Sequence, residues 1–385
     1  MRFACTRFII DPVKPVRQAG FSQQVDPVSK VHDHLHGRLI GLDDGTSMMV
    51  FLSVDSIGLT PTMASDLAAI VHDAYGPQAS FVESATHTHF AGDPRNDVYA
   101  AQLMGQFESE IRGLSWQEVG AITVSHQHMA CQAVGASRIS GHPTDNIFLD
   151  LITLWQGGRR LATFIVYNCH PTIQNGDTPY FSSEYPGYVM EQLTQLYPGE
   201  FFTFMQGADG DVSSRFTRPF QNYDAVVILG DRLKDEIIEL RHQPAGVQPL
   251  RLSYESTVLP LEHEFGPIDV SHLPDGISPR EKETIMVGQK VREELSHHLE
   301  TLAKQVTLSC VGLGPVRILF APNELFSSFI DCIDTSKAVL ACYSNGYAPY
   351  VTDPDFKGLT YEKFTDTLTV PTKQAYKRIL SGWGR

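Results

Sequence analysis

Short apolar runs rich in β-branched and aromatic residues recur along the chain, and this pattern predicts β-strands. Gly, Pro, Asn or Asp residues bound most of these runs, as is usual where strands end. We expect strands at Arg38–Leu42, Met48–Val54, Ser80–Ala85, Ile147–Trp155, Ala162–Asn168, Phe201–Met205, Leu252–Leu259, Val306–Val311 and Val316–Phe320. The dipeptide Gly157-Gly158 separates two of these runs, which predicts a β-hairpin.

Other segments carry apolar residues at helical spacing, and they alternate with the predicted strands. We expect helices at Thr62–Tyr75, Val98–Arg112, Gly187–Tyr197, Ala225–Arg241 and Arg280–Ala303. Thr60 followed by Pro61 is a typical helix start. Alternation with a hairpin in the middle predicts an α/β (α+β) fold, a layered single domain over residues 1–385 with a mixed β-sheet flanked by helices. The Pro- and Gly-containing stretch 262–279 is expected to be a loop insertion or lid.

Composition narrows the class of protein. Hydrophobic residues make up 42% and charged residues 19%, as in folded globular proteins. A formal charge of −14 without a basic cluster argues against nucleic-acid binding. The sequence has no apolar window of the roughly 20 residues that span a bilayer, and its first residues do not resemble a signal peptide. Because the six cysteines are also widely dispersed, we expect a cytoplasmic protein.

Histidines are frequent, with 15 in the chain, and several stand two residues apart. Residues at this spacing share one face of a strand, so each group could offer two imidazoles to one metal ion. The groups are His32/His34/His36, His87/His89 and His126/His128. For the first group a polar face near a strand start is favoured. For the last, without a nearby acid or glycine turn, a solvated strand face is favoured.

The middle pair occurs where a predicted strand gives way to a loop. His87 and His89 follow Ser80–Ala85, and His170 follows another predicted strand in the same way. Glu324 comes directly after Val316–Phe320. Ligands gather at the carboxyl ends of strands in α/β proteins, so these side chains could meet around a divalent metal ion.

Other known motifs do not fit. The sequence has Ala91 and Gly92 where the metallo-β-lactamase pattern requires Asp and His, and it contains no H-E-x-x-H, G-x-S-x-G or P-loop motif. The run Gly207–Ser213 is rich in Gly and Asp. It could be a metal or phosphate loop, or a tight turn built from Asp side chains.

Several short motifs occur in an order that resembles the catalytic domain of the neutral/alkaline (non-lysosomal) ceramidase family, whose members are zinc-dependent amide hydrolases. The motifs are Ser84–His89, Asn168–Thr172, Gly210–Ser213, Pro322–Glu324 and Ser344–Thr352. Segments at Ile10–Pro12 and Val31–Arg38 resemble the start of that domain. The resemblance extends over about residues 5 to 365.

The resemblance implies a ligand set for one zinc ion per chain. The first histidine of T-H-T-H corresponds to His87, the histidine of N-C-H-P to His170, and the acid of the P-x-E motif to Glu324. The tyrosine before Val-Thr corresponds to Tyr350, which spacing alone does not indicate.

The resemblance also implies catalytic residues. His89 matches a residue beside the metal-bound water, Arg138 an active-site arginine, and Tyr361 a tyrosine that holds the substrate carbonyl. The expected reaction is attack of the metal-bound water on an N-acyl carbonyl, with His89 moving the proton.

Departures from the family pattern bear on the substrate. Phe90–Pro94 replaces a small Ser-Gly-Pro, and Ser214-Arg215 replaces Pro-Asn. We therefore expect an N-acyl amide hydrolase whose small-molecule or lipid substrate need not be ceramide. Two alternatives remain open: a metal-dependent hydrolase of a small polar ester, lactone or amide, and a metal-binding homologue without turnover. The sequence does not indicate the oligomeric state, and it leaves open the roles of Ser213 and of the His32/His34/His36 group.

Overall fold

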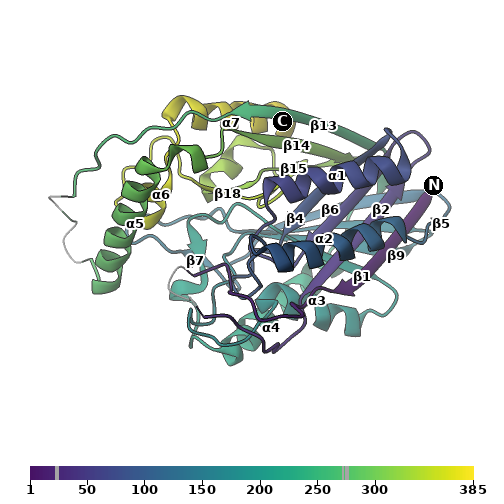
Figure 1. Ribbon diagram of the computed structural model, residues 1–385. Helices are drawn as coiled ribbons and strands as arrows, with labels where there is room; N and C mark the ends of the chain where they lie inside the picture. Colours follow the sequence, from purple (N-terminus) through teal and green to yellow (C-terminus); the bar gives the residue numbers. More distant parts are fainter. Residues whose placement is uncertain (22–25, 271–272, 274–276) are drawn as a thin grey trace.

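The computed structural model describes residues 1–385 except 22–25, 271–272 and 274–276 (Figure 1). The first large sheet has the order β4-β3-β2-β1-β5. Its strands are β1 (Arg2–Ile9), β2 (His36–Asp43), β3 (Met48–Val54), β4 (Ala79–Ala85) and β5 (Gln117–Glu118). The second has the order β10-β9-β8-β6-β12. Its strands are β6 (Ile122–Ala130), β8 (Phe148–Gln156), β9 (Arg159–Tyr167), β10 (Phe201–Gln206) and β12 (Gln248–Pro249).

A third sheet has the order β13-β14-β15-β17. Its strands are β13 (Leu252–Pro260), β14 (Gln305–Leu313), β15 (Val316–Phe320) and β17 (Ala338–Ala341). Short strands pair as β7 (Ala136–Ser137) with β11 (Val212–Ser213), and as β16 (Asn323–Leu325) with β18 (Ala348–Val351). The helices are α1 (Pro61–Tyr75), α2 (Asp97–Arg112), α3 (Glu184–Leu196), α4 (Tyr223–His242), α5 (Pro279–His297), α6 (Tyr361–Thr365) and α7 (Val370–Gly384). Short 3-10 helices lie at Ser214–Phe216 (η1), Leu299–Thr301 (η2) and Ser327–Cys332 (η3).

All three large sheets contribute one face to a common apolar core. Phe51 of β3, Phe164 of β9 and Phe320 of β15 belong to this core. The opposite faces are covered by helices: α1 and α2 pack on the first sheet, α3 and α4 on the second, and α7 on the third (Figure 1). Burying both faces explains why the central strands are continuous apolar runs rather than alternating ones.

The predicted α/β class is therefore confirmed, with the strands divided over three mixed sheets rather than one. Both predicted glycines of the β8–β9 hairpin have positive φ (56° and 85°), as a tight two-residue turn requires. The predicted start of α1 is also confirmed, because the Thr60 hydroxyl accepts a hydrogen bond from the Met63 N–H.

One predicted helix ends earlier than expected, and another helix was not predicted. The predicted helix Arg280–Ala303 ends at His297, because the backbone of His298 leaves the helical region. Helix α7 was not predicted, because buried Thr372 and Lys373 interrupt its apolar stripe. The stretch 262–279 includes residues outside the described part, and its role as a lid stays a prediction. Among the helices that the structure describes, none is both long and apolar enough to cross a membrane.

The topology brings the ends of the sheets together. Each large sheet contains a parallel strand pair: β3 with β4, β9 with β10, and β15 with β17. Backbone hydrogen bonds join the carboxyl ends of these strands, from Ala85 N–H to the Tyr343 carbonyl and from Cys342 N–H to the Gln206 carbonyl. The segments that follow the three sheets consequently meet in one place.

Candidate metal centre

His87 comes two residues after β4 in an unusual backbone conformation. Its φ of 61° lies in the left-handed region, which non-glycine residues rarely adopt outside turns and functional sites. Its Nδ1 lies 2.7 Å from the Ile57 carbonyl oxygen, and its ring stacks on Tyr343 with centroids 3.8 Å apart. These contacts fix the ring so that Nε2 faces the meeting point of the sheets.

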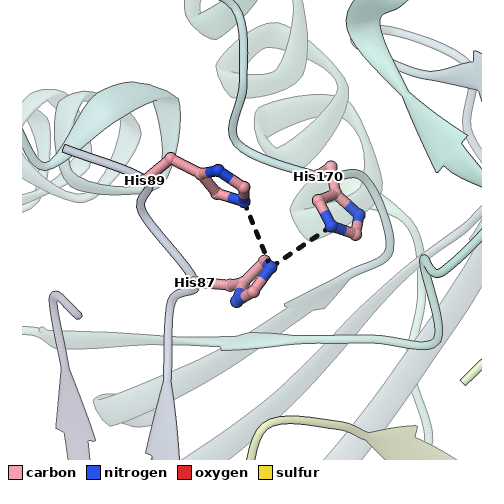
Figure 2. Close-up of side chains that lie close together, drawn as sticks. All are labelled: His87, His89 and His170. Atoms are coloured by element: carbon pink, nitrogen blue, oxygen red, sulfur yellow. Dashed lines mark hydrogen bonds between the residues drawn. The ribbon is translucent and has the colours of Figure 1, made fainter. Parts of the chain in front are cut away.

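His170 reaches the same place from the second sheet. It follows β9, and its Nδ1 lies 2.9 Å from the backbone carbonyl oxygen of Asp209. Its backbone also forms an isolated parallel β-bridge with Ser213. The Nε2 atoms of His170 and His87 are 3.2 Å apart, and the Nε2 of His89 is 3.3 Å from that of His87 (Figure 2).

The orientation of the His87 and His170 rings is that of metal ligands. Each Nδ1 donates its proton to a carbonyl, so each neutral ring has a lone pair on Nε2, and the two lone pairs face each other. A cation between the two Nε2 atoms would remove the repulsion between their lone pairs. In the metal-free protein a proton on His170 can take the place of this cation. Burial disfavours the charged imidazolium, but the charge of Asp209 outweighs the effect of burial and raises the pKa of His170 to about 9. A metal ion would displace that proton.

Glu324 arrives from the third sheet through β16. Its Oε2 lies 3.0 Å from His170 Nε2 and 3.6 Å from His87 Nε2. Burial alone would raise the pKa of the Glu324 carboxyl, yet the neighbouring His170 and His87 hold it well below its usual range. The other oxygen, Oε1, accepts a 2.5 Å hydrogen bond from the Tyr347 hydroxyl. The sequence analysis missed Tyr347, although it lies in the same motif as Tyr350.

Tyr350, on β18, completes the predicted ligand set. Its hydroxyl oxygen lies 3.4 Å from His170 Nε2 and accepts a 3.0 Å hydrogen bond from Arg138 Nη2. Burial raises the pKa of Tyr350 well above its usual value, against the opposing charge of Arg138. The structure thus places the four predicted ligands, His87, His170, Glu324 and Tyr350, around one point.

Arg138 and Tyr361 lie next to this point. Arg138 Nη2 donates to the Gly210 carbonyl at 2.7 Å and forms an ion pair with Glu362 at 3.0 Å. Its buried Nε–H has no hydrogen-bond partner in the part of the chain that the structure describes. Tyr361 begins α6, its ring lies edge-on to Tyr350 with centroids 6.1 Å apart, and burial raises its pKa to about 12. Glu362 is a further residue that the sequence analysis missed.

His89 differs from the other two histidines because it is not held through Nδ1. Within the described residues, its buried Nδ1 has no hydrogen-bond partner. Burial, followed by the charges of His87 and His170, holds the pKa of His89 well below its usual value. A neutral His89 can therefore accept a proton at neutral pH.

These side chains lie at one large cavity of about 2030 Å³. Of the seven predicted site residues, six line it, and the fully buried His170 contacts three of those six. The six are His87, His89, Arg138, Glu324, Tyr350 and Tyr361. A substrate in this cavity would have direct access to them.

The Gly/Asp-rich run Gly207–Ser213 lies next to the site and forms hydrogen bonds with residues around it. Asp209 is fully buried, and its carboxylate accepts hydrogen bonds from the Tyr343 hydroxyl and from the Gln206 amide. The Ser213 hydroxyl accepts a hydrogen bond from the backbone N–H of Arg215 at 3.3 Å. Ser213 therefore caps the short helix η1 through its hydroxyl group.

The other histidine groups are arranged differently. The expectation of a solvated face at His126/His128 is wrong, because their side chains are only 8% and 23% exposed and both contact Asp150 of β8. This acid lies across the sheet, so it could not be seen in the local sequence. His32, His34 and His36 lie nearest to three separate carboxylates, and burial lowers the pKa of His36 to about 4.

Comparison with known proteins identifies the fold. No protein-family model matches the sequence. No curated protein matches it either. Two solved structures are similar over the whole chain and 74% of their own chains. One, a ceramidase complexed with C2, gives a TM-score of 0.79 at 14% identity. The other, neutral ceramidase from Pseudomonas aeruginosa, gives 0.77 at 15%. The layered domain with its buried histidine centre therefore has the neutral ceramidase fold.

Proposed function

We propose that this chain is a zinc-dependent amide hydrolase that cleaves an N-acyl amide. The observation that carries the proposal is the convergence of His87, His170, Glu324 and Tyr350 from three sheets, with two histidine lone pairs facing each other. The similarity of the fold to two solved ceramidases supports the same reaction class.

Zinc fits the donor set better than calcium or magnesium, because two imidazole nitrogens and only two oxygens face the centre. These four side chains would hold the ion. Once bound, it would supply Lewis-acid chemistry and lower the pKa of a coordinated water toward about 7.

The chain's own residues would divide the remaining work. His89 Nε2 would accept a proton from the attacking water and return it to the leaving amine, which a neutral imidazole can do. Arg138 and Tyr361 would donate hydrogen bonds to the carbonyl oxygen as it gains negative charge. Glu362 would hold the Arg138 guanidinium through their 3.0 Å ion pair.

The test is hydrolysis of matched N-acyl amides and esters by protein of known zinc content. We expect amide cleavage that requires about one zinc per chain and is lost in His89→Ala while zinc is retained. Cleavage of esters alone would favour the first alternative. No turnover with zinc bound would favour a metal-binding protein without activity.

A further inference from the structure

A group of arginines lines the cavity away from the ligand set. Arg215, Arg218 and Arg280 all contribute to its wall, although the protein carries a net charge of −14. Within the described residues, none of these three arginines forms an ion pair with a carboxylate. Burial, followed by the charge of Arg280, lowers the pKa of Arg218 to about 10 against the opposing charge of Glu184.

Arg218 is held in place by the backbone beside the metal centre. Its Nη1 donates to the carbonyl oxygens of Thr172 and Ile173, which lie two and three residues after His170. Gln174 comes next and is 1% exposed. Its Oε1 accepts a hydrogen bond from the Tyr180 hydroxyl, whereas its Nε2 has no hydrogen-bond partner in the described part of the chain. A buried N–H donor without an acceptor is unfavourable. Gln174 and Arg218 both line the cavity.

Two of the nearby carboxylates, Glu184 and Glu281, already have other partners. Glu184 accepts hydrogen bonds from the backbone N–H groups of Ile173, Gln174 and Tyr185. Glu281 is the acid of the capping box that begins α5, where it bonds to Ser278. Within the described part of the chain, the free donors of this wall are therefore left for an acceptor that comes from outside.

The same cavity has an apolar wall. Ile285, Val287, Val291 and Leu295 of α5 line it. Helix α5 packs closely on α6, since a Cβ at Gly288 would lie 2.9 Å from the Phe364 Cβ (Figure 1). The apolar wall is thus fixed beside Tyr361, the first residue of α6.

We propose that the cavity accepts an amide that carries both an apolar chain and a carboxylate, as in a fatty N-acyl amino acid. Arg215, Arg218 and Gln174 would bind the carboxylate, and the α5 wall would contact the chain. This inference rests on the proposed hydrolase function. In the reaction one water is consumed and the C–N bond breaks, which yields a fatty acid and a free amino acid with its carboxylate unchanged.

The test compares N-octanoylglycine with its neutral analogue N-octanoylglycinamide. For the wild-type zinc protein we expect kcat/KM to be at least about tenfold higher for the carboxylate, since charge-assisted hydrogen bonds are the stronger kind. Arg218→Gln and Arg215→Gln should each remove most of this preference, measured as the ratio of the two kcat/KM values. Arg215→Gln keeps the backbone contacts of Arg218, so it remains informative if Arg218→Gln does not fold.

Arg95 offers a matched control. It lines the same cavity, but its guanidinium is already paired with Asp93 through contacts of 2.8 and 2.9 Å. Arg95→Gln should keep the preference for the carboxylate. An equal or higher kcat/KM for the neutral amide in the wild type would overturn the anion subsite and leave the amide hydrolase intact.

A binding measurement separates the two proposals. Calorimetric titration of the zinc-loaded His89→Ala protein with both compounds measures binding without turnover. We expect tighter binding of N-octanoylglycine, and at least a tenfold loss of that affinity in Arg218→Gln. If neither compound is hydrolysed, this difference would still support the subsite while the hydrolase proposal fails. Equal binding of the two compounds would overturn the subsite.

Discussion

Two clusters in this molecule place three potential metal ligands within 4.8 Å of one another, yet their chemistry differs. At His126, His128 and Asp150, one carboxylate oxygen lies 2.7 and 2.8 Å from the two ring nitrogens, so each ring can donate to it. At His87, His89 and His170, the Nε2 atoms face one another instead. Proximity of potential ligands is therefore not enough to make a metal site. A nitrogen lone pair remains for a metal ion only where the ring N–H points to another acceptor, as at His87 and His170.

The two clusters also differ in how the fold builds them. His126 and His128 lie on one strand, and Asp150 is the direct cross-strand partner of His128, so the register of a single strand pair creates that cluster. His87 and His170 leave two different sheets, and Glu324 leaves a third. Only the assembled core can bring the second set together, which is typical of sites at strand ends.

The largest expected difference between the clusters is in zinc content. We expect His170→Ala to lose nearly all bound zinc and His128→Ala to keep about one zinc per chain, because only the first removes a lone pair from the centre. Elemental analysis of the two variants, purified beside the wild type, measures this. Equal zinc content in both variants would remove the distinction drawn between the clusters.

A second experiment distinguishes residues that bind the metal ion from residues that act on the substrate at the same centre. Tyr361→Phe removes one hydroxyl beside Tyr350 without touching a proposed ligand. Loss of one such donor typically costs about 2.7–4 kcal/mol of transition-state stabilisation, so kcat should fall about 10²–10³-fold while zinc content stays the same. A parallel loss of zinc would instead place Tyr361 among the metal-holding residues.

The sequence could predict the ligands that follow long apolar strands. The strands before His87, His170 and Glu324 are visible as runs, and their shared carboxyl-end position implied that they meet. Arg138 follows β7, which has only two residues and no apolar pattern, so only the family motif indicated it. Asp209 and Tyr347 act by contacting other site residues, and no local pattern marks such contacts.

The same limit applies to the fold. Sequence periodicity located individual strands, but it contains no information on which sheet a strand joins. The contact between Asp150 and His126 links residues 24 apart through strand pairing. It therefore appears only once the β6–β8 register is known.

A third prediction concerns the pH dependence of zinc binding. Asp209 raises the pKa of His170 to about 9 in the metal-free protein, so below that pH zinc must displace a proton. Zinc affinity should therefore rise about tenfold per pH unit from pH 7 toward 9 and then level off. Competition with a chelator of known affinity measures this. His128→Ala should give the same profile, and an affinity independent of pH would contradict the proton assignment.

The smallest expected effect is on stability, at the second cluster. Burial disfavours the charged form of His128, but the carboxylate of Asp150 outweighs it and raises the pKa of His128 above 6.5. A histidine with a raised pKa in the folded state adds stability that is complete below its unfolded pKa and is lost as pH rises through the folded one. Asp150→Asn should therefore lower the free energy of unfolding by about 1–2 kcal/mol at pH 5.5, and by less at pH 9.

Urea unfolding of Asp150→Asn at the two pH values measures this difference, and the double variant with His128→Gln provides the control. In the background of His128→Gln the pH dependence that comes from His128 should disappear, while His126 keeps its 2.7 Å contact with the carboxylate. The same cost at both pH values would show that His128 stays neutral. Loss of zinc from Asp150→Asn would contradict the assignment of the metal site, because it would mean that the cluster of His126, His128 and Asp150 also holds metal.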